Sequence, residues 1–358
     1  MRHNSFVDLS AFDYHLPDEL IAQQPLADRA ASRMLVVHRA EGRWEDRTFR
    51  DLPSYLRPGD CMVLNDSRVF PARLFGHRTG VKSLPIGRHN PKRHEYLSGQ
   101  VEVFLVRPLS ADAHEWEALV RPGRKMRTGE RIRFDGDLEA EIVGRGEFGE
   151  RTIRFSGVDD VYGALERIGH VPLPPYIKRA DEPADRERYQ TVFAREKGSV
   201  AAPTAGLHFT GEVLDACRGR GAEIAYVTLH VGLGTFQPLH TEHVEEAKLH
   251  SERYAITQEN LERIREAQRV VAVGTTSVRT IETAWRSGAP SGDTDIFIYP
   301  GFEFQRTGAM VTNFHLPKTS LLLLVAAFAG AELALAAYRH AVEQRYRFYS
   351  YGDCMLIV

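Results

Sequence analysis

Three histidines in the sequence stand near small, hydroxyl-bearing or acidic residues, a pattern that can support acid–base chemistry. His208 lies in TAGLHFT, His230 opens HVGLGTFQ, and His250 precedes Glu252 in KLHSE. Imidazole changes its charge near neutral pH, and a neighbouring carboxylate can share its proton. We therefore consider His208, His230, His250 and Glu252 as candidate catalytic acids or bases. The alternative is a structural histidine at His208 and a surface pair formed by His250 and Glu252.

Polar residues also follow several expected strands, at the strand ends where α/β proteins bind ligands. The candidates for substrate binding are Asn65, Asp66, Ser67, Arg68, Gly232, Gly234, Thr235, Gln237, Gly274, Thr275, Thr276, Ser277, Asn313 and His315. Each cluster has a structural alternative, such as an Asx turn at Asn65 or a helix N-cap at Thr275. The Gly-Leu-Gly triplet at residues 232–234 is not GxGxxG, so it is weak evidence for a nucleotide-binding loop.

Positive charge is concentrated in one part of the chain. Residues 73–133 contain 13 Lys and Arg against 6 Asp and Glu, although the whole chain has a formal net charge of −2. A basic stretch on an acidic body can bind nucleic acid. The candidates for phosphate contacts are Arg73, Arg121, Arg124, Lys125 and Lys318. A solvated surface with no nucleic-acid partner is the alternative.

The hydrophobic pattern differs between two parts of the chain, which predicts two domains. Between about residues 72 and 155, short runs such as VEVFLVR and RTIRF alternate with Gly-containing turns, which indicates a small antiparallel barrel or sandwich. After residue 159, strands alternate with helices, as in RVVAVGTTSVRTIETAW, which is typical of an α/β fold with parallel strands. The pattern therefore predicts an α/β protein with a β insertion.

Composition and motifs exclude several classes of protein. The chain is 43% hydrophobic and 26% charged, an ordinary globular balance. Its cysteines, Cys61, Cys217 and Cys354, are far apart and form no CxxC, so neither a disulfide framework nor a zinc site is expected. We expect a cytoplasmic protein, because the N-terminus has no signal-peptide pattern. The apolar run 321–331 is too short to span a bilayer and predicts a buried helix.

Nine segments, in order, resemble the QueA family of S-adenosylmethionine:tRNA ribosyltransferase-isomerases. They are FDYHLPDELIAQQPLADRAASRMLVV, LRPGDCMVLNDSRVFPARLFG, GHVPLPPYIKR, RYQTVFAREKGSVAAPTAGLHFT, VTLHVGLGTFQPL, KLHSERYAI, VVAVGTTSVRTIE, VTNFHLPKTSLLLLVAAFAG and RFYSYGDCMLIV. Two departures are visible: residues 81–100 are longer than the usual glycine turn of the family, and Lys318-Thr319-Ser320 swaps two hydroxyl residues. The swap keeps a hydroxyl donor at each position.

The resemblance implies a transferase that moves and isomerises the ribosyl group of S-adenosylmethionine. The acceptor would be 7-aminomethyl-7-deazaguanine at the wobble position of tRNA, and the products would be epoxyqueuosine tRNA, adenine and methionine. S-adenosylmethionine would be a co-substrate, with no bound cofactor and no metal. We expect a monomer that does not engage membranes.

The family resemblance and the hydrophobic pattern together predict the architecture. Residues 1–69 and 156–358 would form a discontinuous, barrel-like α/β catalytic domain, and residues 70–155 would form an inserted antiparallel β-barrel. Two other functions are weighed against this reading. An RNA methyltransferase would leave S-adenosylhomocysteine, and the weak glycine pattern argues against it. A non-catalytic tRNA-binding protein would not need polar clusters at strand ends far from the basic stretch.

Overall fold

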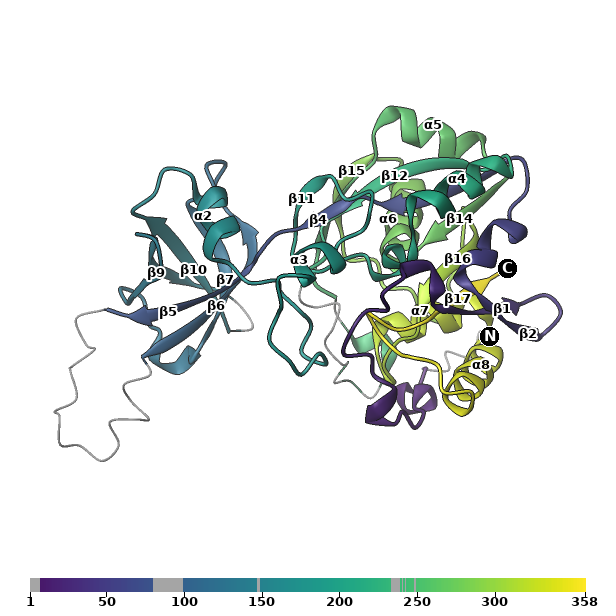
Figure 1. The fold of residues 1–358 in the computed structure, drawn as a ribbon, viewed down its shortest axis with the longest axis horizontal. Coiled ribbons are helices and arrows are strands. Elements are labelled where there is room, and N and C mark those ends of the chain that lie inside the picture. Colours follow the sequence, from purple (N-terminus) through teal and green to yellow (C-terminus); the bar gives the residue numbers. More distant parts are fainter. Residues whose placement is uncertain are drawn as a thin grey trace, which may run out of the picture. The chain divides into compact units, whose positions relative to one another are not determined.

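The structure is a computed structural model that describes residues 7–79, 99–146, 149–232, 239, 241, 243–247 and 249–358. The chain forms two compact units. The main unit consists of Met1–Arg68 and Pro174–Val358, and the barrel unit consists of Val69–Leu173. Figure 1 shows the helices of the main unit around its sheet and the strands β5–β10 of the barrel unit.

The main unit is built on one sheet of nine strands, in the order β15-β13-β12-β3-β14-β16-β17-β1-β2. The strands are β1 (Arg33–His38), β2 (Arg43–Thr48), β3 (Asp60–Asn65), β12 (Glu223–Leu229), β13 (Glu252–Ala255), β14 (Arg269–Val273), β15 (Ser291–Thr294), β16 (Thr307–Asn313) and β17 (Cys354–Ile357). Strands β12, β3, β14 and β16 run parallel, so their carboxyl ends share one edge. Strand β17 is antiparallel to β16, so it begins at that edge.

Helices cover both faces of this sheet, which explains why its central strands are apolar throughout. All six residues of β3 are buried. Leu35 and Val37 of β1 pack into one core with α6, α7 and α8, whereas Met34 and Val36 pack into a second core with α4. The α-helices of the main unit are α3 (Asp185–Arg188), α4 (Gly211–Gly219), α5 (Gln258–Glu266), α6 (Thr275–Ser287), α7 (Ser320–Ala329) and α8 (Ala331–Glu343).

Shorter elements complete the main unit. The 3-10 helices are η1 (Leu9–Phe12), η2 (Asp18–Leu20), η3 (Arg29–Ala31), η4 (Phe49–Tyr55), η7 (Thr204–His208) and η9 (Val244–Glu246). Strand β11 (Glu196–Ser199) pairs with β4 (Ser67–Val69) in a two-stranded sheet. The predicted α/β class is confirmed, and its sheet is open, with β15 and β2 at the edges.

The most apolar helix, α7, is buried, as predicted for residues 321–331. Thr319 caps it by accepting a hydrogen bond from the backbone N of Leu322 at 3.4 Å, and Gly330 ends it with a φ of +91°. Among the described residues, no single helix has the length and hydropathy to cross a membrane, and α7 and α8 meet that test only as a pair bent by 115°, by length and composition alone.

The barrel unit is a closed antiparallel barrel with the strand order β10-β7-β6-β5-β8-β9, which confirms the predicted insertion of this type. Its strands are β5 (Arg73–Arg78), β6 (Gln100–Pro108), β7 (Glu115–Arg121), β8 (Arg131–Arg133), β9 (Glu139–Arg145) and β10 (Glu150–Ser156). The buried Trp116 fills its core and donates a hydrogen bond from Nε1 to the carbonyl of Ala113 at 2.6 Å.

The barrel unit continues past residue 155, where the sequence pattern predicted its end. Helix α2 (Val161–Ile168) belongs to it, because Tyr162 packs edge-on against Trp116 with 5.8 Å between ring centroids. This ring contact ties the segment after β10 to the barrel core. Of the long loop predicted at 81–100, residues 81–98 lie outside the described part of the chain.

A buried carboxylate fixes α6 against the start of β16. Glu282 of α6 has no exposed surface. It accepts hydrogen bonds from the backbone N–H groups of residues 305–307 at 2.8–3.1 Å and from Thr307 Oγ1 at 2.8 Å. Four donors compensate for the hydration that the carboxylate loses on burial. The helix and the strand are thereby held in one register.

We expect Glu282→Gln to lower the free energy of unfolding by about 2–3 kcal/mol, because the new amide group places a donor against backbone donors. Urea denaturation measures the change. Glu266→Gln, at an exposed position of α5, is the matched control and should change stability by less than about 0.5 kcal/mol. Equal stability of the two variants would contradict a clamping role for Glu282.

Candidate active site

Several loops meet at the carboxyl edge of the main sheet and line a pocket with an empty volume of about 670 Å³, open solvent included. The loops follow β12, β14 and β16, precede β17, and include η7. The lining residues are Tyr176, Ala202, Pro203, Thr204, Ala205, Val231, Gly274, Thr275, Thr276, Thr312, Asn313, Phe314, His315, Leu316, Thr319, Leu321, Tyr349 and Ser350.

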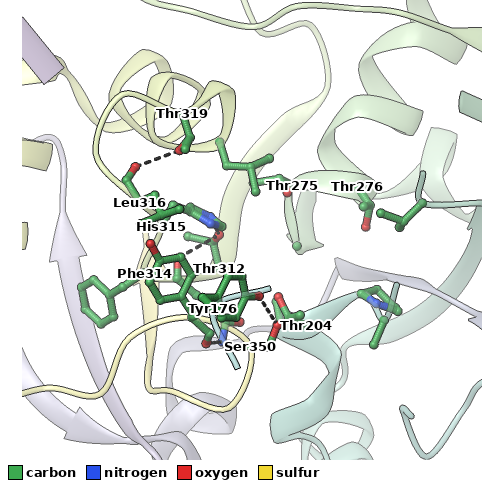
Figure 2. Close-up of a pocket in the computed structure, with 18 residues that line it drawn as sticks. Tyr176, Thr204, Thr275, Thr276, Thr312, Phe314, His315, Leu316, Thr319 and Ser350 are labelled. Carbon is green, nitrogen blue, oxygen red and sulfur yellow. Dashed lines mark hydrogen bonds between the residues drawn. The ribbon is translucent and has the colours of Figure 1, made fainter. Parts of the chain in front are cut away.

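The pocket combines aromatic surface with hydroxyl groups. Tyr176 and Tyr349 stack with their ring centroids 4.3 Å apart, and the Tyr176 hydroxyl lies 2.5 Å from Ser350 Oγ. Figure 2 shows Tyr176, Thr204, Thr275 and Ser350 around the same space. A flat polar ring with attached hydroxyl groups, as in a nucleoside, matches such a lining.

Helix α6 begins at the pocket. Gly274 turns the chain from β14 into the helix with a φ of +89°, a conformation that strains other residues. Thr275 and Thr276 line the pocket, and Thr276 Oγ1 is buried with no hydrogen-bond partner among the described residues. Ser277 Oγ instead donates to the carbonyl of Val273 at 2.8 Å. Gly274, and not Thr275, is the N-cap residue, so the threonine hydroxyls are not used as caps.

The loop after β16 contributes an amide and an imidazole. Asn313 Nδ2 donates to the carbonyl of Tyr349 at 2.8 Å, whereas Asn313 Oδ1 is buried without a partner in the described part of the chain. His315 Nε2 lies 2.8 Å from Thr312 Oγ1. Burial lowers the pKa of His315 to about 3, so its ring is neutral at physiological pH.

His208 lines a second cavity, with an empty volume of about 290 Å³, that shares Ser350 with the pocket. Ser32 Oγ donates to the carbonyl of Arg29 at 3.1 Å and lies 2.7 Å from His208 Nδ1. Nε2 of His208 is buried. Burial lowers the pKa of His208 to about 4, and a hydrogen bond with the Asn313 side chain opposes this shift. His208 is therefore neutral at physiological pH.

Glu252 holds the start of the loop after β12. It is buried, its Oε1 accepts from the backbone N of Gly232 at 2.9 Å, and its Oε2 pairs with Arg279 of α6. Both oxygens are engaged, which fits a positioning role better than proton transfer. His250 is exposed and precedes β13, whereas Glu252 is buried, so the two do not form the surface pair that was the alternative for them.

His230 packs against β11. A Cβ on Gly198, whose φ is +137°, would lie 2.9 Å from His230 Cε1, so the imidazole ring requires glycine there. Nδ1 of His230 is buried and has no partner within the described ranges. Burial lowers the pKa of His230, and the charge of Arg253 acts in the same direction. This ring is a second neutral imidazole with an available nitrogen.

Asn65 is structural. Its Oδ1 accepts from the backbone N of Ser67 and of Leu229, both at 3.1 Å, and its Nδ2 donates to the Leu229 carbonyl at 3.0 Å. This is the Asx turn that was the structural alternative for the cluster. The Ser67 hydroxyl is buried and lacks a partner in the described structure, and Arg68 is exposed.

Asp66 lies at the carboxyl end of β3 and is buried. Its Oδ1 accepts from Thr228 Oγ1 at 2.7 Å, and its Oδ2 lies 3.3 Å from Arg195 Nη2. Burial raises the pKa of Asp66, while the Thr228 hydrogen bond and the Arg195 charge oppose that shift. Asp66 thus links two neighbouring strands and is set apart from the large pocket, which it does not line.

The pocket brings together Gly274, Thr275, Thr276, Asn313 and His315 of the predicted substrate-binding residues. Gly234, Thr235 and Gln237 lie outside the described residues. The remaining predicted residues do not line it. Sequence reasoning missed Tyr176, Thr204, Tyr349 and Ser350, although PPYIKR, PTAGLH and RFYSYGD had been noted for their resemblance. Within the described ranges, no group of three or more His, Cys, Asp or Glu could hold a metal ion.

The predicted phosphate-binding residues differ in whether a carboxylate neutralises their charge. Arg73 pairs with Glu102 at 2.8 Å, and Lys318 pairs with Asp13 at 2.5 Å. Arg121 and Arg124 are exposed and form no ion pair with any described residue. The side chain of Lys125 lies outside the described structure. The exposed arginines are therefore the better candidates for contact with a polyanion.

These features define a two-unit α/β protein with a small-molecule pocket at the carboxyl ends of its parallel strands. The sequence model of the queuosine biosynthesis protein family matches residues 9–357, and the chain belongs to that family. An S-adenosylmethionine:tRNA ribosyltransferase-isomerase of Solibacter usitatus is 76% identical over 352 residues, which cover 98% of this chain and 100% of that protein. An enzyme of the same name from Symbiobacterium thermophilum is 53% identical, over 98% of this chain and 99% of that protein.

A solved structure is also similar. The crystal structure of S-adenosylmethionine tRNA ribosyltransferase from Thermotoga maritima is 38% identical in sequence and has a TM-score of 0.53. The match covers 97% of this chain and 100% of that one. The likeness therefore extends over both units of the chain.

We expect the buried, neutral His208 to make stability depend on pH. Its pKa is about 4 in the folded chain against an ordinary 6.5, so the unfolded chain binds the proton better. The contribution of the neutral ring to the free energy of unfolding is fully present above pH 6.5 and is lost as the pH falls towards 4. When the pH falls from about 7.5 to about 4.5, the free energy of unfolding of the parent should decrease by about 2–3 kcal/mol more than that of His208→Gln. Urea unfolding measures this, and equal losses would contradict the buried neutral ring.

Proposed function

We propose that this chain transfers and isomerises the ribosyl group of S-adenosylmethionine onto 7-aminomethyl-7-deazaguanine at the tRNA wobble position. The products are epoxyqueuosine tRNA, adenine and methionine, in queuosine biosynthesis. The observation that carries the proposal is the 76% identity, over 98% of the chain, to a relative that bears this enzyme name. The family match over residues 9–357 supports it independently of any single relative.

The large pocket is the best candidate for a nucleoside part of the substrates. The stacked Tyr176 and Tyr349 offer a planar apolar surface, and Thr275 and Thr276 bring hydroxyl groups beside the start of α6. The unpartnered Thr276 Oγ1 and Asn313 Oδ1 can bond to ligand hydroxyl or amino groups. S-adenosylmethionine acts here as a co-substrate that is consumed, and we propose no resident cofactor or metal.

The chemistry sets what the protein must supply. The sulfonium acidifies the C5′ proton of the donor ribose, so a base can remove it. Loss of adenine opens the sugar, and the aminomethyl nitrogen of the acceptor base attacks. Closure of the epoxide then expels methionine as a neutral thioether. The enzyme must provide a base, a proton for the departing adenine, and alignment of two large substrates.

His208 and His230 are the imidazoles best suited to the proton transfers. Burial lowers the pKa of each, and Nδ1 of His230 is buried without a partner among the described residues. A ring with a lowered pKa is unprotonated before reaction and gives up an acquired proton easily, as a proton relay to adenine needs. Glu252, through Gly232 and Arg279, positions the neighbouring loop. His250 remains a predicted acid or base.

The barrel unit offers a docking surface for the tRNA backbone beside the turn η5 (Gly123–Lys125). Buried Arg151 supports that turn, because its guanidinium donates to the carbonyls of Gly123 and Met126 at 2.9 and 3.1 Å. Exposed Arg121 precedes the turn and exposed Arg124 lies within it, and neither forms an ion pair with any described residue. Cations that are not neutralised by carboxylates bind phosphates more strongly than paired ones.

The compartment and assembly are part of the same proposal. The three cysteines, Cys61, Cys217 and Cys354, are free and buried. Free thiols support a reducing compartment, and we propose the cytoplasm. The monomer remains a prediction, which light scattering on the purified chain measures.

Product analysis tests the proposed reaction. We expect the protein, given S-adenosylmethionine and tRNA that carries 7-aminomethyl-7-deazaguanine, to release adenine and methionine and to form an epoxyqueuosine nucleoside. Mass spectrometry of the small molecules and of the digested tRNA identifies each product. S-adenosylhomocysteine would show methyl transfer instead. tRNA binding without donor turnover would show a binding protein.

Salt dependence tests the docking surface. We expect Arg121→Gln combined with Arg124→Gln to reduce the slope of log Kd against log salt concentration for tRNA by about 1–2, because each lost phosphate contact removes about 0.7–0.9. Filter binding at several salt concentrations measures the slope. Arg167→Gln, exposed on α2 of the same unit, is the control and should keep the parent slope. An unchanged slope in the double variant would place the docking surface elsewhere.

A further inference from the structure

The second cavity, beside His208, is lined by two arginines and by no acidic residue. Arg29 comes from η3, and Arg188 is the last residue of α3. Neither forms an ion pair with a carboxylate in the described part of the chain. The other lining residues are Pro25, Leu26, Ser32, Leu207, His208, Ser350, Tyr351 and Gly352. The cavity therefore has two guanidinium groups in its wall and no carboxylate among its lining residues.

Backbone carbonyls hold both guanidinium groups in place. Arg29 donates to the carbonyls of Leu207 at 3.1 Å and of Glu187 at 2.8 Å. Arg188 donates to the carbonyls of residues 26 and 27 at 2.6 and 2.8 Å. Carbonyl groups orient a guanidinium but do not cancel its charge. The two side chains are thus fixed in advance at the wall of the cavity.

Three further observations show that positive charge is concentrated there, although the carboxylates of Asp28 and Glu187 lie near enough to act on the two arginines. Arg188 Nε is buried and has no hydrogen-bond partner among the described residues. Burial lowers the pKa of Arg29, and repulsion from Arg188 acts in the same direction, with Glu187 opposing. The charges of Arg29 and Arg347 also lower the pKa of His208. A bound anion would relieve this repulsion and use the free donor.

We propose that this cavity is a binding site for an oxyanion, a carboxylate or a phosphate, held between Arg29 and Arg188. The cavity is the smaller of the two spaces, with an empty volume of about 290 Å³, open solvent included, against about 670 Å³ for the pocket. Ser350 lines both this cavity and the large pocket. Helix η7 also joins them, because Thr204 lines the pocket and His208 lines the cavity. The pocket and the cavity are therefore neighbours on the two sides of Ser350.

Two sources of the oxyanion follow if the proposed function is right. One is the carboxylate in the methionine part of S-adenosylmethionine, and the other is a phosphate of the tRNA backbone. Both are recognised by the same pair of guanidinium groups. The site itself does not depend on turnover, so it can be tested with a simple anion.

The first test uses inorganic phosphate on the full chain. Phosphate should raise the thermal unfolding midpoint of the parent above that in chloride at equal ionic strength. Arg29→Gln and Arg188→Gln should each remove this increase, whereas Arg220→Gln, an exposed arginine of the same unit, should keep it. No difference between phosphate and chloride in the parent would overturn the proposal, without any variant having to fold. An increase retained in both cavity variants would also overturn it.

The second test separates the sources by comparing S-adenosylmethionine with its decarboxylated analogue in calorimetry. If the donor carboxylate is bound, the parent should bind the analogue about tenfold or more weakly, and Arg188→Gln should lose that distinction. If a tRNA phosphate is bound, the two donors should bind equally, and Arg188→Gln should reduce the salt slope for tRNA by about 0.7–0.9. If Arg188→Gln changed neither the discrimination between the two donors nor the salt slope for tRNA, the proposed oxyanion site would be wrong. A parent that releases no adenine would overturn only the proposed reaction.

Discussion

The pocket depends on one buried carboxylate that lies away from it. Glu282 accepts hydrogen bonds from the backbone N–H groups of residues 305–307, at and just before the start of β16, and so fixes how far α6 lies along the sheet. The same helix brings Thr275 and Thr276 to the pocket at its first turn, and the same strand brings Asn313 there at its end. A shift of the helix by one residue would rotate its threonines away from the pocket, because successive helical residues point about 100° apart. The register of a helix against a strand thus defines the binding surface.

Burial, more than charge pairing, sets the chemistry of the imidazoles. His208 and His315 are each surrounded by protein, and both are neutral at physiological pH because the interior disfavours the imidazolium ion. Ser32 Oγ lies 2.7 Å from Nδ1 of His208, so a hydrogen bond holds the ring in place. A ring that is held in advance lowers the reorganisation needed when a substrate enters.

Much of the fold could be predicted from sequence because hydrophobic patterns report burial locally. The alternating strands of residues 72–155 predicted the barrel, and the apolar strands with intervening helices predicted the covered sheet. The boundary at residue 155 was less predictable, since it depends on a ring contact between Tyr162 and Trp116 that joins segments distant in sequence. The site was predicted in part for the same reason. Residues that directly follow parallel strands, such as Gly274 and Asn313, were found, whereas Tyr176 and Tyr349 reach the pocket from irregular segments whose position only the folded chain determines.

The place of β17 in the sheet has a consequence for how the protein is made. This strand lies between β16 and β1, and its pairing aligns Met34 with Cys354. Of the described strands it is the last to leave the ribosome, yet it occupies an interior position. Until it arrives, the edges of β16 and β1 lack this hydrogen-bonding partner. Such open edges can associate with other chains while the protein is being made.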